Sequence, residues 1–293
     1  MPIPPIHINA KGIGKPLIKL IESVSKGIGQ VYEPTKIRRK AKAQADAGLI
    51  LAKGEIKKKE LYLRAAHRLA FRETRRQETI EAIVEQARDY LPETVSKEPV
   101  SDDWTFQFFE HCQDVTEAEM QKLWARMIAG EVAQPRTYSR RTLEVLKTFD
   151  TGDAKAFADY CSFCFCTSDG AHFTFQGQST FDMLEQRCQG CQSHVVSLGL
   201  IDSQDSLYQA PKLEGWVVEY FGKTYQLSAP PPPPIEPTGV QPPGALVAVK
   251  FLTAVGEELV SLVSAVPVRG FVKKQANELD NIKMQFAPKR SGR

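Results

Sequence analysis

The sequence has no long hydrophobic run. None of its apolar stretches approaches the roughly 18 to 20 consecutive residues that a helix needs to cross a bilayer. The first ten residues, MPIPPIHINA, also lack the charged start and apolar middle of a secretory signal. We therefore expect a cytoplasmic protein whose membrane contact, if it has any, is peripheral and at the inner face.

Catalytic signatures are absent as well. The sequence contains no phosphate-binding GxxxxGK, no HExxH and no GxSxG. The histidines form no spacing that is typical of a catalytic triad or a histidine metal cage; they are His7, His67, His111, His172 and His194. No nucleophile with its base can be recognised. The sequence therefore favours a non-enzymatic protein with no small-molecule substrate.

Cysteine is scarce, with 6 residues among 293, which argues against a secreted disulfide scaffold. Four of them form two C-x2-C pairs, Cys161 with Cys164 and Cys188 with Cys191, separated by 23 residues. Two such pairs can build a four-coordinate zinc site. Against zinc, the stretch FADYCSFCFC lacks the glycines that usually open a zinc knuckle, and free cysteine is often buried. The sequence favours buried thiols and leaves structural zinc as the one cofactor alternative.

Basic charge is concentrated near the amino terminus. Lys11 to Arg76 holds 18 Lys and Arg against 6 Asp and Glu, an excess of 12, so the rest of a chain with net charge +3 sums to −9. A basic arm on an acidic body suits an anionic partner. The candidate nucleic-acid or anionic-surface residues are Lys36, Arg38, Arg39, Lys40, Lys42, Arg72, Arg75 and Arg76. The alternative is a solvated helix face with Glu60, Glu73 and Glu78 as ion-pair partners.

The segment GIGKPLIKLIESVSKGIG (residues 12–29) predicts an amphipathic helix. Its apolar residues recur at the i, i+3, i+4, i+7 spacing of one helical face and form the candidate membrane- or partner-facing stripe Leu17, Leu20, Ile21, Val24 and Ile28. It carries no aromatic anchor of the kind found in dedicated surface peptides. We expect it to pack against protein most of the time, with membrane contact as a conditional state.

The fold class that the sequence predicts is mainly α. We expect a flexible tail (1–10), a basic amphipathic helical arm (11–91), a central helical domain (101–166), a small α+β winged-helix-like domain (167–285) with a proline-rich loop (229–244), and a basic tail (286–293). Ser101 or Asp102 and then Thr116 are expected to cap helices of the central domain. The stretch WVVEYFGKTYQL predicts a hairpin around a Gly-Lys turn, ALVAVKFLT a strand, and AVGEELVSLVS a helix capped by Thr253.

A winged-helix-like unit raises the question of DNA binding. Its expected recognition helix, 181–197, carries only Arg187 as a cation, against Asp182 and Glu185. A helix that enters the major groove should present more cationic or amide side chains to bases and phosphates. The sequence therefore argues against DNA readout by this helix.

One block of sequence resembles a known family. LWARMIAGEVAQPRTYSRRTLEVLK, with LIESVSKGIGQVYEPTKIRRKAKA before it and LGLI and LTAVGEEL after it, resembles an uncharacterised bacterial family, domain of unknown function 2806. It is also distantly similar to the abortive-infection alpha proteins. The matching positions include Trp124, Glu131, Pro135, Ser139 and Arg141, and the resemblance covers residues 15–285. It brings no catalytic residues and implies phage defence or stress response.

Glu131 and Arg141 are the charged members of that block. They are expected to form an ion pair that locks the turn around Pro135, or else to contribute to a binding surface. The function that the sequence favours is a non-enzymatic binding protein with a protein partner or a second copy, acting through its basic arm. The alternatives are a nucleic-acid-associated regulator, and a zinc-containing enzyme or zinc-stabilised module.

Overall fold

The computed structural model describes residues 14–28, 56–229, 245–281 and 285–288, which divide between two compact units, Met1–Phe149 and Asp150–Arg293. Several expectations lie outside the described residues. These are the tail 1–10, all but the first residue of the loop 229–244, and the basic candidates Lys36, Arg38, Arg39, Lys40 and Lys42. Among the described helices, none has both the length and the apolar character needed to span a membrane.

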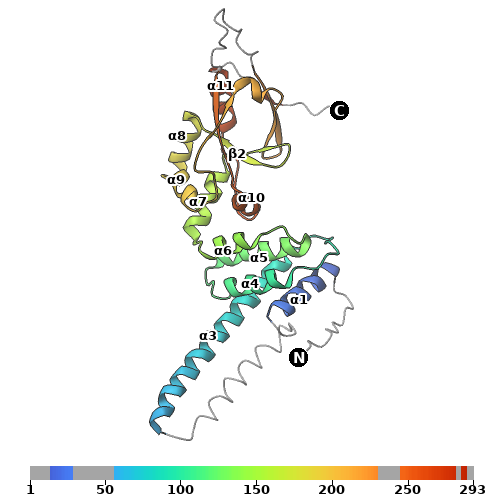
Figure 1. The fold of residues 1–293 in the computed structure, drawn as a ribbon, viewed down its shortest axis with the longest axis vertical. Coiled ribbons are helices and arrows are strands. Elements are labelled where there is room, and N and C mark those ends of the chain that lie inside the picture. Colours follow the sequence, from blue (N-terminus) through green and yellow to red (C-terminus); the bar gives the residue numbers. More distant parts are fainter. Residues whose placement is uncertain (1–13, 29–55, 230–244, 282–284, 289–293) are drawn as a thin grey trace, which may run out of the picture. The chain divides into compact units, whose positions relative to one another are not determined.

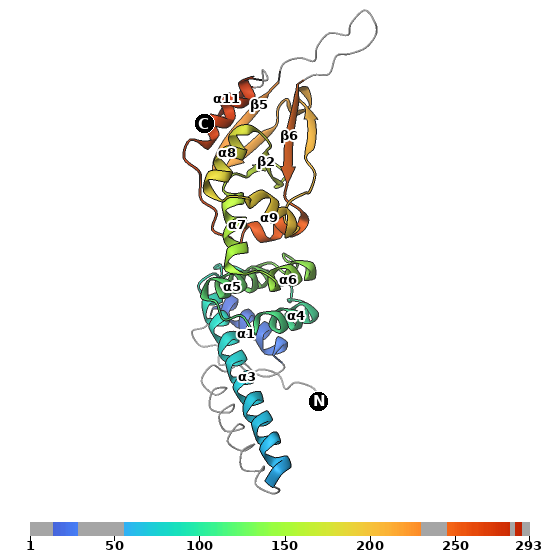
Figure 2. The ribbon, with the colours of Figure 1, turned by 90° about the vertical axis from the view of Figure 1, so that its left-hand side faces the viewer.

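The first unit is built from helices. They are α1 (Lys15–Gly27), α3 (Ile56–Arg88), α4 (Asp102–Cys112), α5 (Ala118–Ala133) and α6 (Arg140–Lys147). In Figures 1 and 2, α1, α4, α5 and α6 gather at one end of α3, and the rest of α3 extends beyond them. The helices expected as a separate arm therefore pack with the central helices in one unit, because α1 contacts α4 and α5 and α3 contacts α5.

Aromatic side chains form the centre of this unit. The ring of Phe108 stacks on Trp104 at 5.2 Å between centroids and meets Trp124 edge-on at 5.3 Å. Phe108 and Trp124 are fully buried and Trp104 is 4% exposed. Rings of this size bury a large apolar area for few side-chain torsions, so they contribute much of the packing free energy.

The helix starts test the capping predictions. Ser139 caps α6 by accepting a hydrogen bond from the Thr142 amide, as its position predicts. Ser101 is the N-cap residue of α4, although its side chain makes no capping bond. The prediction for Thr116 was wrong, because α5 begins after Glu117 and no side chain caps it. Instead, the Gln121 side chain reaches back from α5 and donates to the Val115 carbonyl at 2.9 Å.

The second unit combines helices with an antiparallel sheet of short strands. In chain order its elements are α7 (Thr151–Cys161), β1 (Phe165–Thr167), β2 (His172–Phe175), α8 (Gln178–Arg187), α9 (Cys191–Ser197), β3 (Ser206–Gln209), the 3-10 helix η1 (Ala210–Leu213), β4 (Val217–Tyr220), β5 (Lys223–Ser228), β6 (Leu246–Phe251), α10 (Ala254–Val260), α11 (Phe271–Asn281) and β7 (Gln285–Pro288). The sheet order is β3-β6-β2-β1-β4-β5-β7, and β7 occupies the start of the expected basic tail. The chain is thus mainly helical, as predicted, with an antiparallel sheet in its second half.

The sheet elements confirm some local predictions. The expected hairpin is β4–β5, the strand from ALVAVKFLT is β6, and Thr253 caps α10 by accepting from the Gly256 amide. The turn of the hairpin was placed wrongly. Tyr220 pairs with Lys223, so the turn residues are Phe221 and Gly222, with φ of 46° and 77°. Positive φ at both central residues matches the twist of the flanking strands.

The predicted helix 181–197 is two helices. α8 ends at Arg187 and α9 begins at Cys191, with Gly190 between them at φ 69°. A residue in the left-handed region cannot continue a right-handed helix, so the chain turns there. The residue pattern did not distinguish this break from a continuous amphipathic helix.

The border between the two units lies at 149/150, whereas the sequence placed a domain border at 166/167. Helix α7 belongs to the second unit because it packs on α9. The Tyr160 hydroxyl lies 2.8 Å from Thr174 Oγ1 on β2, and the Cys191 thiol donates to the Ala156 carbonyl at 3.0 Å. These contacts join α7 to elements that follow it.

Candidate binding surface on helix α3

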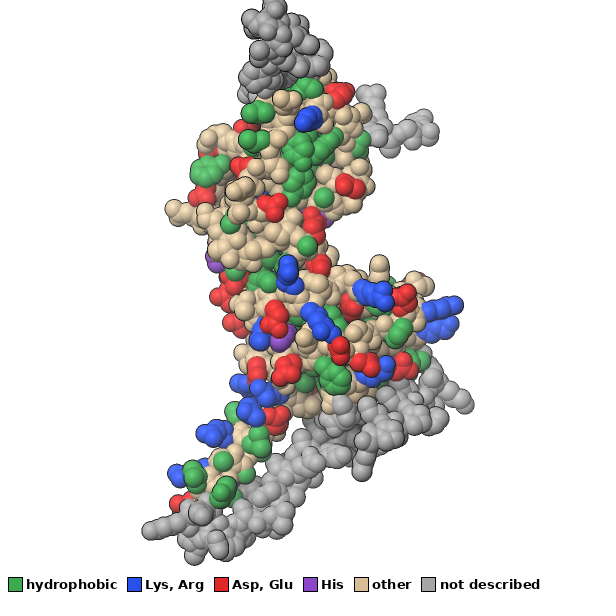
Figure 3. Space-filling model, viewed as in Figure 1, with side chains coloured by type: hydrophobic (Ala, Val, Ile, Leu, Met, Phe, Trp, Pro, Cys, Tyr) green, Lys and Arg blue, Asp and Glu red, His purple; other side chains and the backbone are tan. Residues whose placement is uncertain are grey.

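The most exposed helical surface of the described chain is the first half of α3. We call residues 60–75 the exposed segment of α3, because none of them is buried. Its large apolar side chains are nevertheless open to solvent: Leu61 64%, Tyr62 68%, Leu69 52% and Phe71 74%. Figure 3 shows these hydrophobic side chains interleaved with basic ones along the helix. Four exposed large apolar side chains within eleven residues make this segment a candidate interaction site.

The second half of α3 is packed into the first unit and anchors the helix. Ile83 and Ala87 are fully buried, and Ile80 and Val84 are at most 6% exposed. This face packs on α5. Burying four such side chains contributes several kcal/mol, at about 1.5–3 kcal/mol for each large aliphatic residue. The exposed segment is therefore presented by a well-anchored helix.

Ion pairs join the carboxyl-terminal end of the exposed segment, which we call its foot, to the loop between α4 and α5. Arg75 Nη2 lies 2.7 Å from Asp114 Oδ1, and Arg76 Nη2 lies 2.7 Å from Asp114 Oδ2. Hydrogen bonds from Arg76, and then from Arg75, hold the pKa of the Asp114 carboxyl below its usual range. Arg72 pairs with Glu73 at 3.0 Å. The three described members of the basic candidate set thus already have carboxylate partners.

Two further arginines of the segment differ from these three. Arg64 and Arg68 are exposed, and neither forms an ion pair with another residue in the described part of the chain. Sequence reasoning missed both, together with Leu61, Tyr62, Leu69 and Phe71. The signal was the alternation of large apolar and basic residues through LYLRAAHRLAFRE, which a count of charges alone overlooks.

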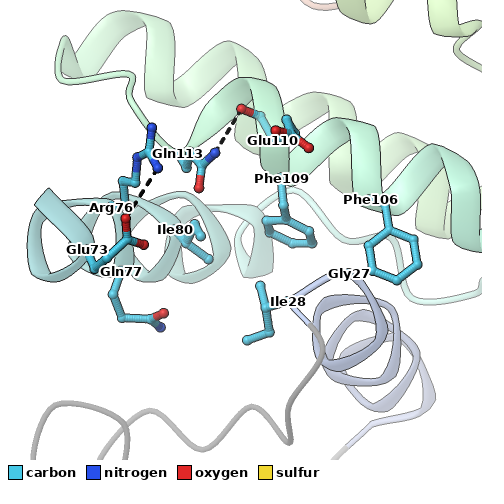
Figure 4. Close-up of a pocket in the computed structure, with 10 residues that line it drawn as sticks. All are labelled: Gly27, Ile28, Glu73, Arg76, Gln77, Ile80, Phe106, Phe109, Glu110 and Gln113. Atoms are coloured by element: carbon cyan, nitrogen blue, oxygen red, sulfur yellow. Dashed lines mark hydrogen bonds and ion pairs between the residues drawn. The ribbon is translucent and has the colours of Figure 1, made fainter. Parts of the chain in front are cut away.

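A pocket of about 390 Å³ lies at the foot of the exposed segment (Figure 4). Helix α3 contributes Glu73, Arg76, Gln77 and Ile80; the other lining residues are Gly27, Ile28, Phe106, Phe109, Glu110 and Gln113. In Figure 4 the Phe106 and Phe109 rings come from α4 and Ile28 follows the end of α1. Polar side chains thus make up much of the pocket lining, beside the Phe106 and Phe109 rings, and the Arg76–Glu73 pair lies at its α3 edge.

The predicted stripe of α1 faces its own unit. Leu20 and Val24 are fully buried, and Leu17, Ile21 and Ile28 are half-buried. Gly27 allows the close approach, because a Cβ at this position would lie under 3.0 Å from the Phe109 ring and the Thr105 methyl group. The stripe therefore packs against α4 and α5, and it reaches the pocket only through Ile28.

The block shared with the resembled family forms a structural lock. Trp124 and Glu131 are buried, and so is Pro135. Glu131 accepts hydrogen bonds from the amides of Arg136, at 2.6 Å, and Tyr138, at 3.1 Å. Ser139 then caps α6, and Arg141 is exposed on that helix. Glu131 therefore stabilises the turn around Pro135 by accepting from backbone amides. The sequence had predicted that it would do so through an ion pair with Arg141.

The candidate zinc cysteines are held by backbone groups. The Cys164 thiol donates to the Tyr160 carbonyl at 3.8 Å and the Cys191 thiol to Ala156. Burial raises the pKa of the Cys161 and Cys191 thiols. Over the ranges that the structure describes, no three His, Cys, Asp or Glu side chains are arranged to hold a metal ion.

A second cavity, of about 310 Å³, lies in the second unit. Cys161, Cys164 and Cys166 line it together with His172, whose Nδ1 lies 2.6 Å from Glu257 Oε2. Cys188 and Cys191 do not line it. The two C-x2-C pairs therefore do not meet in one site. The carboxylate fixes the imidazole, but the nearby Cys166 thiol has its pKa raised, first by burial and then by Glu257. That environment opposes a nucleophilic role.

Residues 63–204 match the model of a family described as a protein of unknown function, DUF2806. The match supports the resemblance to an uncharacterised domain family over a shorter range than the expected 15–285. It begins within the exposed segment of α3, after Tyr62, and continues through α9. No curated protein and no solved structure matches the chain.

Proposed function

We propose that this chain is a non-enzymatic binding protein that holds a partner protein on the exposed segment of α3. The observation that carries the proposal is the set of four large apolar side chains exposed on an anchored helix, among arginines that lack intramolecular partners in the described chain. Leaving such side chains in water is unfavourable, and a partner that covers them gains their burial free energy.

A protein fits this surface better than a nucleic acid. Phosphate binding relies on cations that are free to replace counterions. Here Arg72, Arg75 and Arg76 are already paired with carboxylates and are not free in this sense. Apolar groups such as Phe71 and Leu69 find complementary surface on a protein. Aromatic and arginine side chains are also the residues enriched at the centres of protein interfaces.

Photo-crosslinking in the native cells tests this function. A photoreactive phenylalanine analogue replaces Tyr62, Leu69 or Phe71 in turn, and the matched control carries it at Phe181, which is 57% exposed on α8. We expect protease-sensitive adducts from at least one α3 position and none from position 181. The absence of adducts from all three α3 positions, or adducts that only nuclease removes, would contradict the proposal.

The cellular setting that we propose is bacterial phage defence or stress response, which the resemblance to abortive-infection alpha proteins supports. In this version α1 stays packed until a trigger releases it toward a membrane at the inner face or another subunit. Release would expose the fully buried Leu20 and Val24. Plaque counts on cells that express the chain are expected to fall, and the R64E/R68E variant should restore them. Equal protection by that variant would count against a role of the α3 surface in defence.

A second candidate is a nucleic-acid-associated regulator, and the connectivity of the second unit favours it. Helix α7 precedes β2, helices α8 and α9 precede β3, and β6 pairs between β3 and β2. This pairing supports our proposal of a winged-helix-like unit, in which β1 and the β4–β5 hairpin would be additions. Its second and third helices offer few cations, since Arg187 pairs with Asp159 and His194 with Asp153. In this candidate the unit serves dimerisation and α3 supplies affinity.

Gel-shift titration separates this candidate from the first. Binding of duplex DNA or RNA that is retained at about 50 mM salt and falls steeply as salt rises would favour the regulator. Failure to retain either nucleic acid at that salt concentration removes it.

A further inference from the structure

The exposed segment of α3 continues the face that packs on α5. Ile80, Ile83 and Ala87 are buried on that face. Steps of seven residues back from Ile83 reach Arg76, Leu69 and Tyr62, and steps from Ala87 reach Ile80, Glu73 and Ala66. Such a repeat, with steps of three and four, is the seam along which helices pack side by side. We call Tyr62, Ala66 and Leu69 the open seam.

The pocket at the foot of the segment lies on the same line. Its α3 residues are Glu73, Arg76, Gln77 and Ile80, which are spaced three, four and seven residues apart and continue the open seam toward the buried face. A helix lying along the open seam would therefore run from the tip of α3 toward this pocket. The 16 residues of the exposed segment give it a track of about 24 Å.

One flank of the open seam is positively charged. Arg68, Arg72 and Arg75 follow one another at spacings of four and three residues, which places them in a row on the same side of the helix. Asp114 already binds the end of this row through Arg75, so the chain itself provides one example of a carboxylate docked on that flank. A further carboxylate on a partner would meet Arg68, which forms no ion pair in the described part of the chain, whereas Arg72 is already paired with Glu73.

We propose that the partner element is an acidic amphipathic helix that packs lengthwise on the open seam, sets a carboxylate against Arg68, and ends at the pocket beside Phe106 and Phe109. This inference rests on the proposed function and names the kind of partner. A second copy of α3 is a poorer occupant, because it would bring a second row of arginines to the same seam. Nucleic acid has no counterpart for the apolar seam.

A designed peptide tests the inference on the full chain. The probe is a fluorescent peptide of three heptads with leucine at both seam positions and glutamate on the flanks; its control is a scrambled peptide of the same composition. Binding is followed by fluorescence anisotropy at low and high salt. We expect the patterned peptide to bind at least about tenfold more tightly than the scrambled one. Because the two peptides carry the same charge, such a difference would come from the order of their residues.

Variants locate the site on the helix. L69A and R68E/R72E are each expected to weaken peptide binding about tenfold. The matched control is F181A, because Phe181 is 57% exposed on α8, outside the exposed segment of α3. It should bind the peptide as the unmodified chain does. Circular dichroism checks that each variant keeps its helix content.

Several results would overturn the inference. Equal binding of the scrambled peptide would mean that charge alone attracts it, and an equal loss with F181A would mean that the loss does not depend on the open seam. Tighter binding of duplex DNA than of the patterned peptide would favour nucleic acid. If the patterned peptide fails to bind while crosslinks still form from position 71, the inference fails and the proposed function stands. If no α3 position crosslinks, the proposed function fails as well.

Discussion

At the scale of single residues, Glu131 is a buried carboxylate that holds a loop. It is 1% exposed, and its two oxygens accept from the amides of Arg136 and Tyr138. Arg136 has a φ of 71°, which is uncommon for a residue with a side chain. The bonds to Glu131 help to keep the backbone in that conformation. The charge therefore serves the turn and not a ligand.

Removing this carboxylate should destabilise the first unit. E131A leaves buried amides without acceptors, and we expect it to lower the free energy of unfolding by about 3 kcal/mol. E131Q should lose less, because the amide oxygen can still accept. Urea denaturation followed by tryptophan fluorescence measures both. E119A, on the exposed side of the same helix, is the control, and a loss for E131A as small as for E119A would refute the locking role.

Gly27 allows α1 to pack closely against α4, because it has no Cβ atom. A side chain here would overlap the Phe109 ring and the Thr105 methyl group of α4. We expect G27A to destabilise the unit by about 1–3 kcal/mol through overpacking. G14A is the matched control, since its Cβ would meet only Pro16, at an ordinary 3.7 Å. Equal stabilities of the two variants in urea denaturation would contradict the close packing of α1 on α4.

At the scale of elements, the attachment of α3 depends on Asp114. Its pKa is lowered by Arg76 and Arg75, so the folded state favours the ionised carboxylate. A lowered pKa contributes stability that is present above the usual carboxyl range, and this contribution disappears as pH falls through the folded-state pKa. The ion pairs at the foot of α3 are therefore intact at neutral pH and weaken only in acid.

The D114N variant tests this dependence. At neutral pH it should unfold at a lower urea concentration than the unmodified chain, and the difference should shrink between about pH 5 and pH 2, as the carboxylate of the unmodified chain becomes protonated. Denaturation midpoints across that range provide the measurement. A difference that stays constant down to pH 2 would show that the charge of Asp114 does not attach α3.

At the scale of the whole molecule, each unit has its own core. Phe108 and Trp124 are buried in the first unit, and Phe165 and Phe173 are buried in the second. Separate cores predict separate folding. The contacts of α7 with α9 and β2 place the natural cut before α7 and not at its end.

Division of the chain tests this organisation. Residues 1–149 and 150–293, produced as separate polypeptides, should each unfold cooperatively, and the sum of their circular dichroism spectra should reproduce that of the full chain. The control is a cut at 166/167, which removes α7 from the second unit and strips Phe157 and Tyr160 from its core. We expect that shorter fragment to lose cooperative unfolding. Equal behaviour of the two carboxyl-terminal fragments would contradict the border at 149/150.

Local rules predicted much of the secondary structure. Helical periodicity identified α1, Thr253 marks a helix start as expected, and the two-residue spacing of a hairpin identified β4 and β5. These features depend on neighbours within a few residues, so the sequence contains them directly. The break between α8 and α9 was missed because Cys188, in extended backbone, and Gly190, at φ 69°, interrupt the helix without interrupting the apolar pattern.

The pairing and burial of residues on the candidate surface could not be predicted from the sequence. The sequence by itself determined a basic amino-terminal region, a mainly helical chain and an amphipathic α1. Only the tertiary structure decided which of those charges are paired, since Asp114 lies 38 residues from Arg76 along the chain and 2.7 Å from it in space. It also decided that the stripe of α1 is covered while Tyr62 and Leu69 are exposed. Charge and periodicity are properties of the chain, but burial and pairing depend on which distant segments meet.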